Sequence, residues 1–387
     1  MSDRNIRMAI LDDGVHPSVC SLAGSFRIED DLSVAALEDN AVSPDSHGSM
    51  CARIVQLYTE LADVDVYSIQ ILQGDTLRGN VKRLLKAFEL CESMDIRLIH
   101  LSVGTYAYED FAKLEEAVKR LLCVDRFLVA ASGNRGTVTY PAYLPGVIGV
   151  KYHPKLMDDE YIYDYDSFSR IHFQASSEHK LYLQGQRAET SVSNSYAAPL
   201  ITAKILSYLK ANADADKDEI LRLLMEHAGN EAPSQESEPR PYPPVEIPVV
   251  LLSGFSAERL AHLLGTLMDG LRREDYDARA ATNLSGNRPW DETALPGLSP
   301  WDETALPESG NLDEFIARMA WYFSCEIILL GITSYLPPDR CRNASLWIYG
   351  DESDDWQTRA AKAEGQVLRA SELPDHEVYQ FMIDMLT

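Results

Sequence analysis

The stretch SVSNSYAAPLITAKILSYL, residues 191–209, is the part of the sequence on which the interpretation of the chain depends. Small and polar residues lead into a long apolar run, and Pro199 follows Ser195 by four positions. This pattern is typical of a helix with a serine cap and proline near its start. It also suits a nucleophilic serine, because the unpaired N–H groups of a helix N-terminus attract negative charge. The rest of the chain decides between the two interpretations.

Composition limits the class of protein and its surroundings. The 387 residues, 45% hydrophobic and 25% charged, suffice for two or three globular domains. The formal net charge of −25 disfavours nucleic acid or an anionic membrane surface as a partner, because both attract basic proteins. Six scattered cysteines, without a CxxC pair, indicate free thiols in a reducing compartment. Since the sequence shows neither a signal peptide nor an apolar run that could span a bilayer, it predicts a cytoplasmic protein.

Over about the first 210 residues, short apolar runs alternate with amphipathic stretches, as they do in βαβ units. The spacing predicts strands at 6–11, 64–72, 96–104, 126–132 and 146–152. It predicts helices at 47–62, 80–94, 112–123, 197–211 and 216–228. We therefore expect an α/β fold, a doubly wound parallel sheet with helices on both faces.

A second, smaller α/β domain is expected after a linker. Residues 230–246 are rich in Pro, Glu and Ser and cannot form a core, so the predicted domains are 1–229 and 247–387. In the second domain the pattern predicts strands at 247–254, 326–332 and 344–350 and helices at 257–273, 313–324, 354–363 and 375–386. Its first strand–loop–helix lacks the GxxxxGK[ST] signature of a phosphate-binding loop. Substrate recognition or dimerisation is the role that we predict for this domain.

An internal repeat lies in a predicted loop, residues 285–311. The eight residues PWDETALP occur at 289–296 and again at 300–307. A surface loop expanded by duplication, natural or engineered, explains the repeat most simply. A docking motif is the alternative.

Four polar residues stand where acyl-transfer chemistry would need them. Asp12 ends the first strand, His47 begins a helix, Asn134 follows a strand and Ser195 begins a helix. Acyl transfer requires a nucleophile, a base, an acid that orients the base and donors for the oxyanion. Each residue taken singly also fits a structural role in a cap or turn. Together, in this order, they favour the chemical interpretation.

The first 229 residues or so resemble the subtilisin-like serine peptidases, the subtilase family. The Asp-Ser/Thr-Gly, His-Gly-Thr and Ala-Ala-Gly-Asn motifs of that family are similar to Asp12-Asp13-Gly14, His47-Gly48-Ser49 and Ala131-Ser132-Gly133-Asn134. The segments Tyr140–Val150 and Ser167-Phe168-Ser169 match two further conserved runs of the family. The order Asp, His, Ser is that of subtilisin.

The resemblance implies a role for each of the four residues. Ser195 would be the nucleophile, His47 the general base and Asp12 the group that orients the imidazole. The Asn134 side chain and a free Ser195 backbone N–H would form the oxyanion hole. Where the family has Gly-Thr-Ser, this chain has Ser193-Asn194-Ser195. Ser191 is a rival nucleophile, but only Ser195 has Ala at +2 and Pro at +4.

The resemblance also implies a pocket for the substrate residue before the scissile bond, P1. Its walls would be Ser102, Val103 and Gly104 on one side and Ala131, Ser132 and Gly133 on the other, with Arg135 at the rim and Thr139 at the floor. Because the Thr139 side chain would shorten the pocket, we expect small or polar P1 residues rather than large aromatic ones.

The predicted function is a serine endopeptidase that cleaves a specific peptide or precursor, with neither cofactor nor metal. The chain begins at its first strand, without the pro-domain of secreted subtilases, and so resembles intracellular members that remove leader peptides in peptide natural-product maturation. A general degradative subtilase and an impaired pseudo-peptidase that binds peptides are the alternatives. The sequence leaves homo-oligomerisation open.

Overall fold

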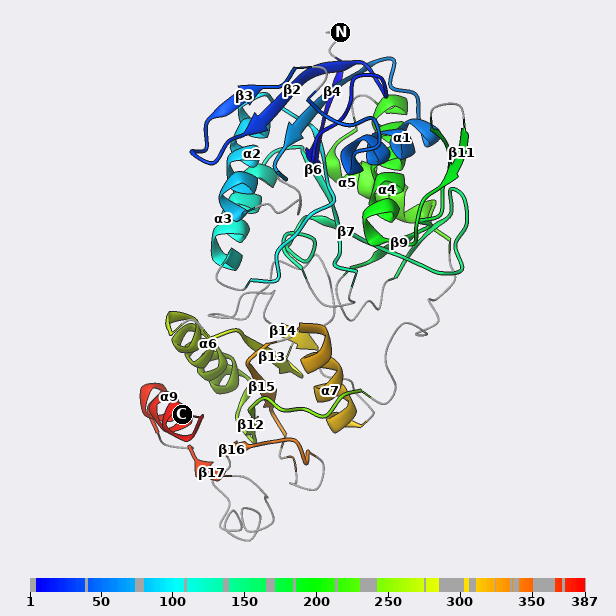
Figure 1. Ribbon diagram of the computed structural model, residues 1–387. Coiled ribbons are helices and arrows are strands. Elements are labelled where there is room, and N and C mark those ends of the chain that lie inside the picture. Colours follow the sequence, from blue (N-terminus) through cyan, green and yellow to red (C-terminus); the bar gives the residue numbers. More distant parts are fainter. Residues whose placement is uncertain are drawn as a thin grey trace. The chain divides into compact units, whose positions relative to one another are not determined.

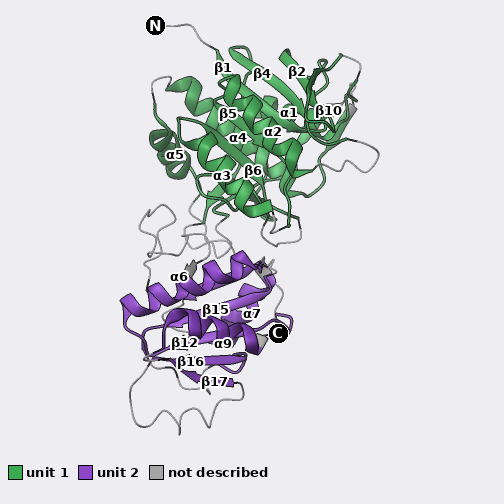
Figure 2. Cartoon of the chain, turned by 90° about the vertical axis from the view of Figure 1, so that its left-hand side faces the viewer, with its two compact units in different colours: residues 1–235 green, residues 236–387 purple. Residues whose placement is uncertain are grey.

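The computed structural model describes most of the chain, in two compact units that comprise residues 1–235 and 236–387 (Figure 2). The described residues are 5–38, 41–73, 80–107, 110–134, 139–164, 171–183, 186–212, 215–229, 242–274, 276–284, 303–305, 311–323, 325–334, 336, 341–350, 366–370 and 373–386. Several predicted features lie outside them: Arg135, the motif at 167–169, most of the linker, most of the repeat loop and the helix at 354–363.

A twisted sheet organises the first unit, and in the described residues its strands follow the order β3-β2-β4-β1-β5-β6-β7-β9-β8. The strands are β1 (Ile6–Asp12), β2 (Leu22–Ile28), β3 (Val34–Ala36), β4 (Val64–Gln70), β5 (Leu98–Leu101), β6 (Phe127–Ala131), β7 (Ile148–Tyr152), β8 (Tyr161–Tyr163) and β9 (Phe173–Ala175). All neighbours from β2 to β9 pair in parallel, as predicted. The edge strands β3 and β8 are antiparallel to their neighbours, so the sheet is mixed rather than wholly parallel.

Helices cover both faces of this sheet. They are α1 (His47–Tyr58), α2 (Val81–Ser93), α3 (Phe111–Leu122), α4 (Asn194–Ala211) and α5 (Lys217–Glu226). Helices α2 and α3 lie on one face, and α1, α4 and α5 lie on the other (Figure 1). A separate antiparallel hairpin, β10 (Lys180–Leu183) and β11 (Gln186–Glu189), lies just before α4 in the chain. The predicted doubly wound α/β architecture is therefore confirmed.

Helix α4 is the central element of its layer. It contacts strands β5, β6, β7 and β9 as well as helices α1 and α5. Apolar residues all around it are buried, which is typical of a core helix rather than an amphipathic surface helix. It begins at Asn194, earlier than the predicted Ala197, because Ser193 supplies the N-cap. The site residues near Ser195 are thus fixed on the best-buried helix of the unit.

The second unit contains a parallel sheet with the strand order β14-β13-β15-β12-β16-β17 in its described part. The strands are β12 (Val249–Ser253), β13 (Ala278–Thr282), β14 (Glu303–Ala305), β15 (Ile327–Ile332), β16 (Leu346–Tyr349) and β17 (Gln366–Arg369). The helices are α6 (Ala257–Arg273), α7 (Leu312–Phe323) and α9 (Asp375–Leu386). Helices α6 and α9 pack together on one face, with α7 on the other (Figure 1).

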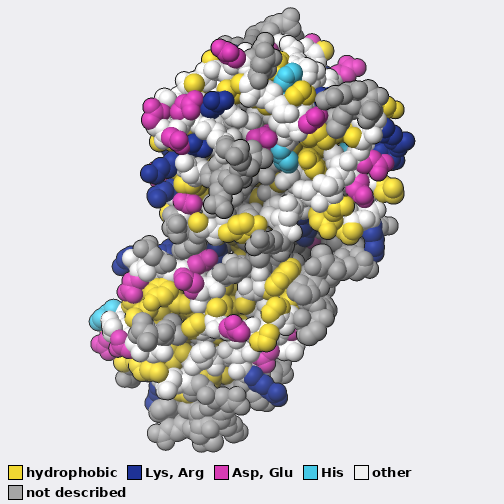
Figure 3. Space-filling model, in the orientation of Figure 1, with side chains coloured by type: hydrophobic (Ala, Val, Ile, Leu, Met, Phe, Trp, Pro, Cys, Tyr) yellow, Lys and Arg dark blue, Asp and Glu magenta, His cyan; other side chains and the backbone are white. Residues whose placement is uncertain are grey.

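Surface charge, helix hydrophobicity and cysteine pairing are the three features that composition had addressed. On the face drawn in Figure 3, acidic and basic side chains of the described residues are interspersed rather than separated by sign. None of the described helices is long and apolar enough to cross a membrane. All six cysteines are free.

Close packing at the start of α1 predicts that Gly48→Ala destabilises the first unit. A Cβ atom on Gly48 would lie 2.5 Å from the Gly14 carbonyl oxygen and 3.2 Å from the Asp12 Cβ. Backbone atoms cannot yield as a flexible side chain can, so we expect a loss of about 1–3 kcal/mol in the free energy of unfolding. Urea denaturation measures this change. The exposed Gln56→Ala on the same helix serves as the control, expected within about 0.5 kcal/mol of wild type; equal midpoints for both variants would contradict the prediction.

Candidate active site

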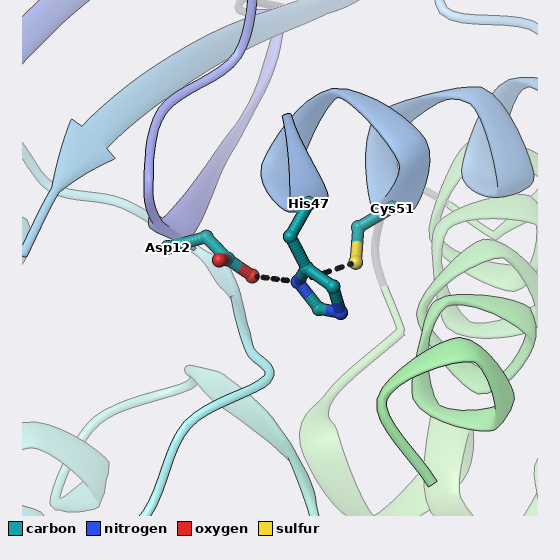
Figure 4. A group of neighbouring side chains, drawn as sticks. All are labelled: Asp12, His47 and Cys51. Atoms are coloured by element: carbon teal, nitrogen blue, oxygen red, sulfur yellow. Dashed lines mark hydrogen bonds and ion pairs between the residues drawn. The ribbon is translucent and has the colours of Figure 1, made fainter. Parts of the chain in front are cut away.

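The side chains of Asp12 and His47 meet where β1 ends and α1 begins. Asp12 is the last residue of a central strand and fully buried, and its Oδ2 lies 2.8 Å from His47 Nδ1 (Figure 4). Since an ionised carboxylate only accepts, the proton of this hydrogen bond belongs to Nδ1. The other ring nitrogen, Nε2, faces away from Asp12 and is left as a base.

A second carboxylate holds the start of α1 in place. The carboxylate of Asp13 accepts hydrogen bonds from the backbone N–H groups of His47, at 3.0 Å, and Gly48, at 2.8 Å. A negative charge at a helix N-terminus is favourable, because unpaired N–H groups point toward it. Burial, and then the charge of Asp12, raises the pKa of Asp13. Sequence reasoning missed this role, although the second carboxylate was visible in the motif Asp12-Asp13-Gly14.

The surroundings of His47 favour its protonated form. Burial acts to lower the pKa of His47, whereas the hydrogen bond and charge of Asp12 raise it, and the net pKa lies above the ordinary value of 6.5. The buried carboxylate of Asp12 thus stabilises the imidazolium form of His47.

Cys51, one turn along α1, lies at the centre of the site. Its Sγ is 3.8 Å from His47 Nδ1 and 3.4 Å from Ser102 Oγ, and it donates to the Ser195 carbonyl at 3.8 Å. That carbonyl lacks its helical partner because Pro199, four residues on, has no N–H. Complete burial raises the pKa of the Cys51 thiol, so the group is neutral. Asp12, His47 and Cys51 are the one trio of metal-type ligands found together among the described residues, within 4.8 Å of one another.

Ser195 is the second residue of α4, one position before Tyr196. The ring of Tyr196 stacks on the His47 imidazole with centroids 5.1 Å apart. The Ser195 hydroxyl donates to the Ser102 carbonyl over 3.5 Å, a long hydrogen bond. Within the described residues no hydrogen bond joins this hydroxyl to His47. Catalytic hydrogen bonds are often long or misaligned until substrate binds.

The oxyanion donors differ from expectation in one respect. Asn134 Oδ1 accepts the backbone N–H of Asn194 at 2.8 Å, which fixes the amide so that its NH₂ group faces elsewhere. The Ser195 N–H, expected to be free, donates to Ser193 Oγ at 3.1 Å. The expectation of a free N–H is therefore wrong. Its cause is local: the serine that replaces the motif's glycine caps the helix on that group.

Asn194 anchors the start of α4 to the sheet, a role that sequence reasoning also missed. Its Nδ2 donates to the carbonyls of Ser132 and Gly133 at 3.1 and 2.9 Å, and its Oδ1 accepts the Tyr152 N–H at 2.8 Å. The residue is buried and its amide group is fully paired. These bonds join α4 to the ends of β6 and β7, next to Asn134.

The predicted pocket walls follow two neighbouring strands, β5 and β6. Thr139 is buried and its Oγ1 accepts the Gly133 N–H at 3.0 Å. A Cβ on Gly133 would lie 2.7 Å from Thr139 Cγ2 and 2.5 Å from the Tyr106 hydroxyl, and one on Gly104 would lie 3.4 Å from Thr139 Cβ. Thr139 thus contacts both wall segments, and Tyr106, which the sequence did not single out, contacts one.

His100 has a structural role beside Ser102. His100 on β5 has its Nδ1 2.9 Å from Thr202 Oγ1 and its Nε2 2.9 Å from Ser102 Oγ. Burial lowers the pKa of His100 to about 4, so it is neutral and supports Ser102. Ser191, the rival nucleophile, is exposed and precedes the helix.

A family model and three solved structures match part of the chain. The model of the Subtilase family matches residues 3–242. Three solved structures are similar over 57–60% of this chain: "S41 Psychrophilic Protease" (16% identity, 88% of that chain, TM-score 0.45), "Sphericase" (18%, 83%, 0.45) and "Structure of Prenylagaramide maturation protease PagA" (21%, 82%, 0.41). No curated protein matches the chain significantly. Since the family model covers more than half of its length, this chain belongs to the subtilase family and is a subtilisin-like serine endopeptidase.

Proposed function

We propose that Asp12, His47 and Ser195 are the catalytic triad of this peptidase and that Asn134 contributes to its oxyanion hole. The observation that carries the proposal is the buried 2.8 Å bond from His47 Nδ1 to Asp12, on the side of the imidazole opposite to Nε2. Ser195 Oγ attacks the scissile carbonyl and its proton passes to His47 Nε2. Asp12 stabilises the imidazolium, which then protonates the leaving amine. Water hydrolyses the acyl-enzyme by the same steps.

Labelling with a fluorophosphonate tests this assignment. We expect the wild-type protein to be labelled at Ser195, and Ser195→Ala to lose both labelling and peptide hydrolysis, because the nucleophile is gone. Intact and peptide mass spectrometry locate the label. Ser191→Ala, at the exposed neighbouring serine, is the matched control and should retain wild-type labelling. Label on Ser191, or hydrolysis that persists without Ser195, would overturn the assignment.

We further propose that the substrate is a specific peptide or precursor protein, with a small or polar residue at P1. The packing of Thr139 between Gly133 and Gly104, with the Tyr106 hydroxyl next to Gly133, supports a short pocket. Removal of a leader peptide is one reaction of this type. The free thiols of all six cysteines support a reducing compartment such as the cytoplasm for this activity.

The short pocket predicts a change of specificity in Thr139→Gly. Without the threonine side chain the pocket deepens, so the ratio of kcat/KM for a Phe P1 substrate to that for an Ala P1 substrate should rise by about tenfold or more, the lower end of the value of one buried methylene. A series of succinyl-Ala-Ala-Pro-X p-nitroanilides measures the ratio. Tyr106→Phe, which removes only the hydroxyl, is the smaller matched change. A wild-type enzyme that prefers Phe or Tyr at P1 would refute the short pocket, and broad cleavage of casein would favour a degradative role.

The second unit is proposed to serve substrate recruitment. In this proposal residues 247–387 form a separate domain behind a linker at 230–246, and a precursor bound there reaches Ser195 at high effective concentration. The first unit includes everything up to Gly229, whose N–H donates to the Tyr161 carbonyl at 2.9 Å beside β8. The chain up to this residue therefore contains every strand and helix that we assign to the peptidase domain.

Truncation after Gly229 tests the recruitment. We expect residues 1–229 to retain fluorophosphonate labelling and the rate on short peptides, because the site lies wholly within them. The kcat/KM toward the native precursor should fall by a factor of about 10² or more, since docking supplies effective concentration only to that substrate. Cleavage rates of the precursor by the truncated and full-length proteins, measured side by side, give the ratio of the two kcat/KM values. Equal efficiency on the precursor would contradict recruitment, and light scattering would then show whether the second unit forms dimers instead.

A further inference from the structure

All four backbone N–H groups in the first turn of α4 are occupied in the resting enzyme. Ala197 makes the ordinary helical bond to the residue four positions back, whereas the first three groups have no such partner and usually bond to a cap, to water or to a ligand. The Asn194 N–H donates to Asn134 Oδ1 at 2.8 Å, and the Ser195 N–H donates to Ser193 Oγ at 3.1 Å. The N–H groups of Tyr196 and Ala197 both donate to the Ser193 carbonyl, at 3.1 and 3.2 Å. The helix N-terminus therefore offers no unused donor where the oxyanion must form.

The bond from the Ser195 N–H to Ser193 Oγ is the one that matters for the reaction. In the proposed mechanism the carbonyl oxygen of the substrate becomes an oxyanion next to Ser195, and the resemblance to the subtilases assigns this N–H to it as a donor. A single N–H serves one acceptor well. The Ser193 hydroxyl must therefore give up the bond before the oxyanion can take it.

We propose that the Ser193 hydroxyl competes with the substrate oxyanion for the Ser195 N–H and so holds the peptidase below the rate that its triad could reach. This inference rests on the proposed triad. It assigns to Ser193 a positioning role opposed to catalysis, distinct from those of the residues that touch the reacting atoms. A capping serine is ordinary by itself; what sets this one apart is the donor that it occupies.

The backbone does not force a serine at this position. Ser193 has φ −164° and ψ 142°, an extended conformation that any residue adopts, so glycine, alanine and threonine all fit. Its carbonyl continues to accept the N–H groups of Tyr196 and Ala197 whatever the side chain. The anchoring bonds of Asn194 do not involve Ser193. Replacing the side chain therefore changes the one contact under test.

The competition acts on the transition state rather than on substrate binding. In the resting enzyme the Ser195 N–H donates one ordinary hydrogen bond to the neutral Ser193 hydroxyl. When the oxyanion forms, this N–H donates to it instead, in a stronger, charge-assisted hydrogen bond. The loss of the old bond then reduces the rate by about 2- to 10-fold, the equivalent of one net neutral hydrogen bond. We expect it in kcat, with KM nearly unchanged.

The first test is the rate of fluorophosphonate labelling, which needs no knowledge of the natural substrate. In this reaction the Ser195 oxygen forms a bond to phosphorus, fluoride leaves, the proton passes to His47 and the phosphoryl oxygen occupies the oxyanion hole. We expect Ser193→Gly and Ser193→Ala to label about 2- to 10-fold faster than wild type. Ser193→Thr retains the hydroxyl acceptor and is the matched control, with a rate near that of wild type.

The second test separates the transition state from the ground state. The inhibition constant of acetyl-Ala-Ala-Pro-Ala aldehyde, whose adduct with Ser195 places an oxygen in the hole, should fall in Ser193→Gly by the same factor as labelling rises. Binding of the corresponding peptide amide, measured by calorimetry in a Ser195→Ala background with and without the Ser193 change, should not differ. Urea midpoints of all variants show whether altered stability accounts for any difference.

Each outcome decides the proposal. Faster labelling in the Gly and Ala variants with unchanged amide binding supports it. Slower labelling in both variants, with Thr unaffected, would mean that the hydroxyl donates to the oxyanion instead, and would overturn it. Equal rates in all four proteins would overturn it as well. If neither wild type nor any variant labels at Ser195, the triad itself fails, a result distinct from the failure of the competition alone.

Discussion

The pairing of every N–H group in the first turn of α4 is the constraint on which the rest of the site depends. This turn begins a buried helix, and buried backbone donors require partners. Ser193 accepts three of these four bonds, through its hydroxyl from Ser195 and through its carbonyl from Tyr196 and Ala197, and Asn134 Oδ1 accepts the fourth from Asn194. The Asn194 bonds to Ser132, Gly133 and Tyr152 then hold the segment that leads to Asn134 against the helix.

The N-terminus of α1 is also held by side chains, but there the acceptors are charged carboxylates rather than neutral groups. Two adjacent carboxylates at the end of β1 have separate partners: Asp12 binds the imidazole of His47, and Asp13 binds the backbone of the same residue. Side chain and main chain of His47 are therefore fixed from one short segment. Gly48 allows this because a side chain there would collide with the Gly14 carbonyl. Orientation of the base thus depends on the close approach of α1 to the turn after β1.

The extent of agreement between sequence and structure follows from how each element is stabilised. The long periodic helices and the buried central strands were predicted closely, and α6 and α9 match their predicted bounds at 257–273 and 375–386. The missed strands include β3, β8 and β17 at the sheet edges, and also the longer internal strands β2 and β13. The three edge strands have only three or four residues each, too few to show a periodic hydrophobic pattern. Local composition also did not indicate that β3 and β8 pair antiparallel with their neighbours.

The sequence by itself determined the chemical groups of the site, their order along the chain and the strand and helix ends at which they stand. Motifs carry this information because residue type and local pattern are properties of short segments. Only the tertiary structure decided which atoms are paired. The bond from Asn194 to Asn134 spans 60 positions, and the position of Ser102 beside Ser195 spans 93, so both depend on how the sheet brings distant loops together. The occupation of the Ser195 N–H by Ser193 is local in sequence, yet it required the dihedral angles of a helix start and the hydroxyl's direction, which composition does not specify.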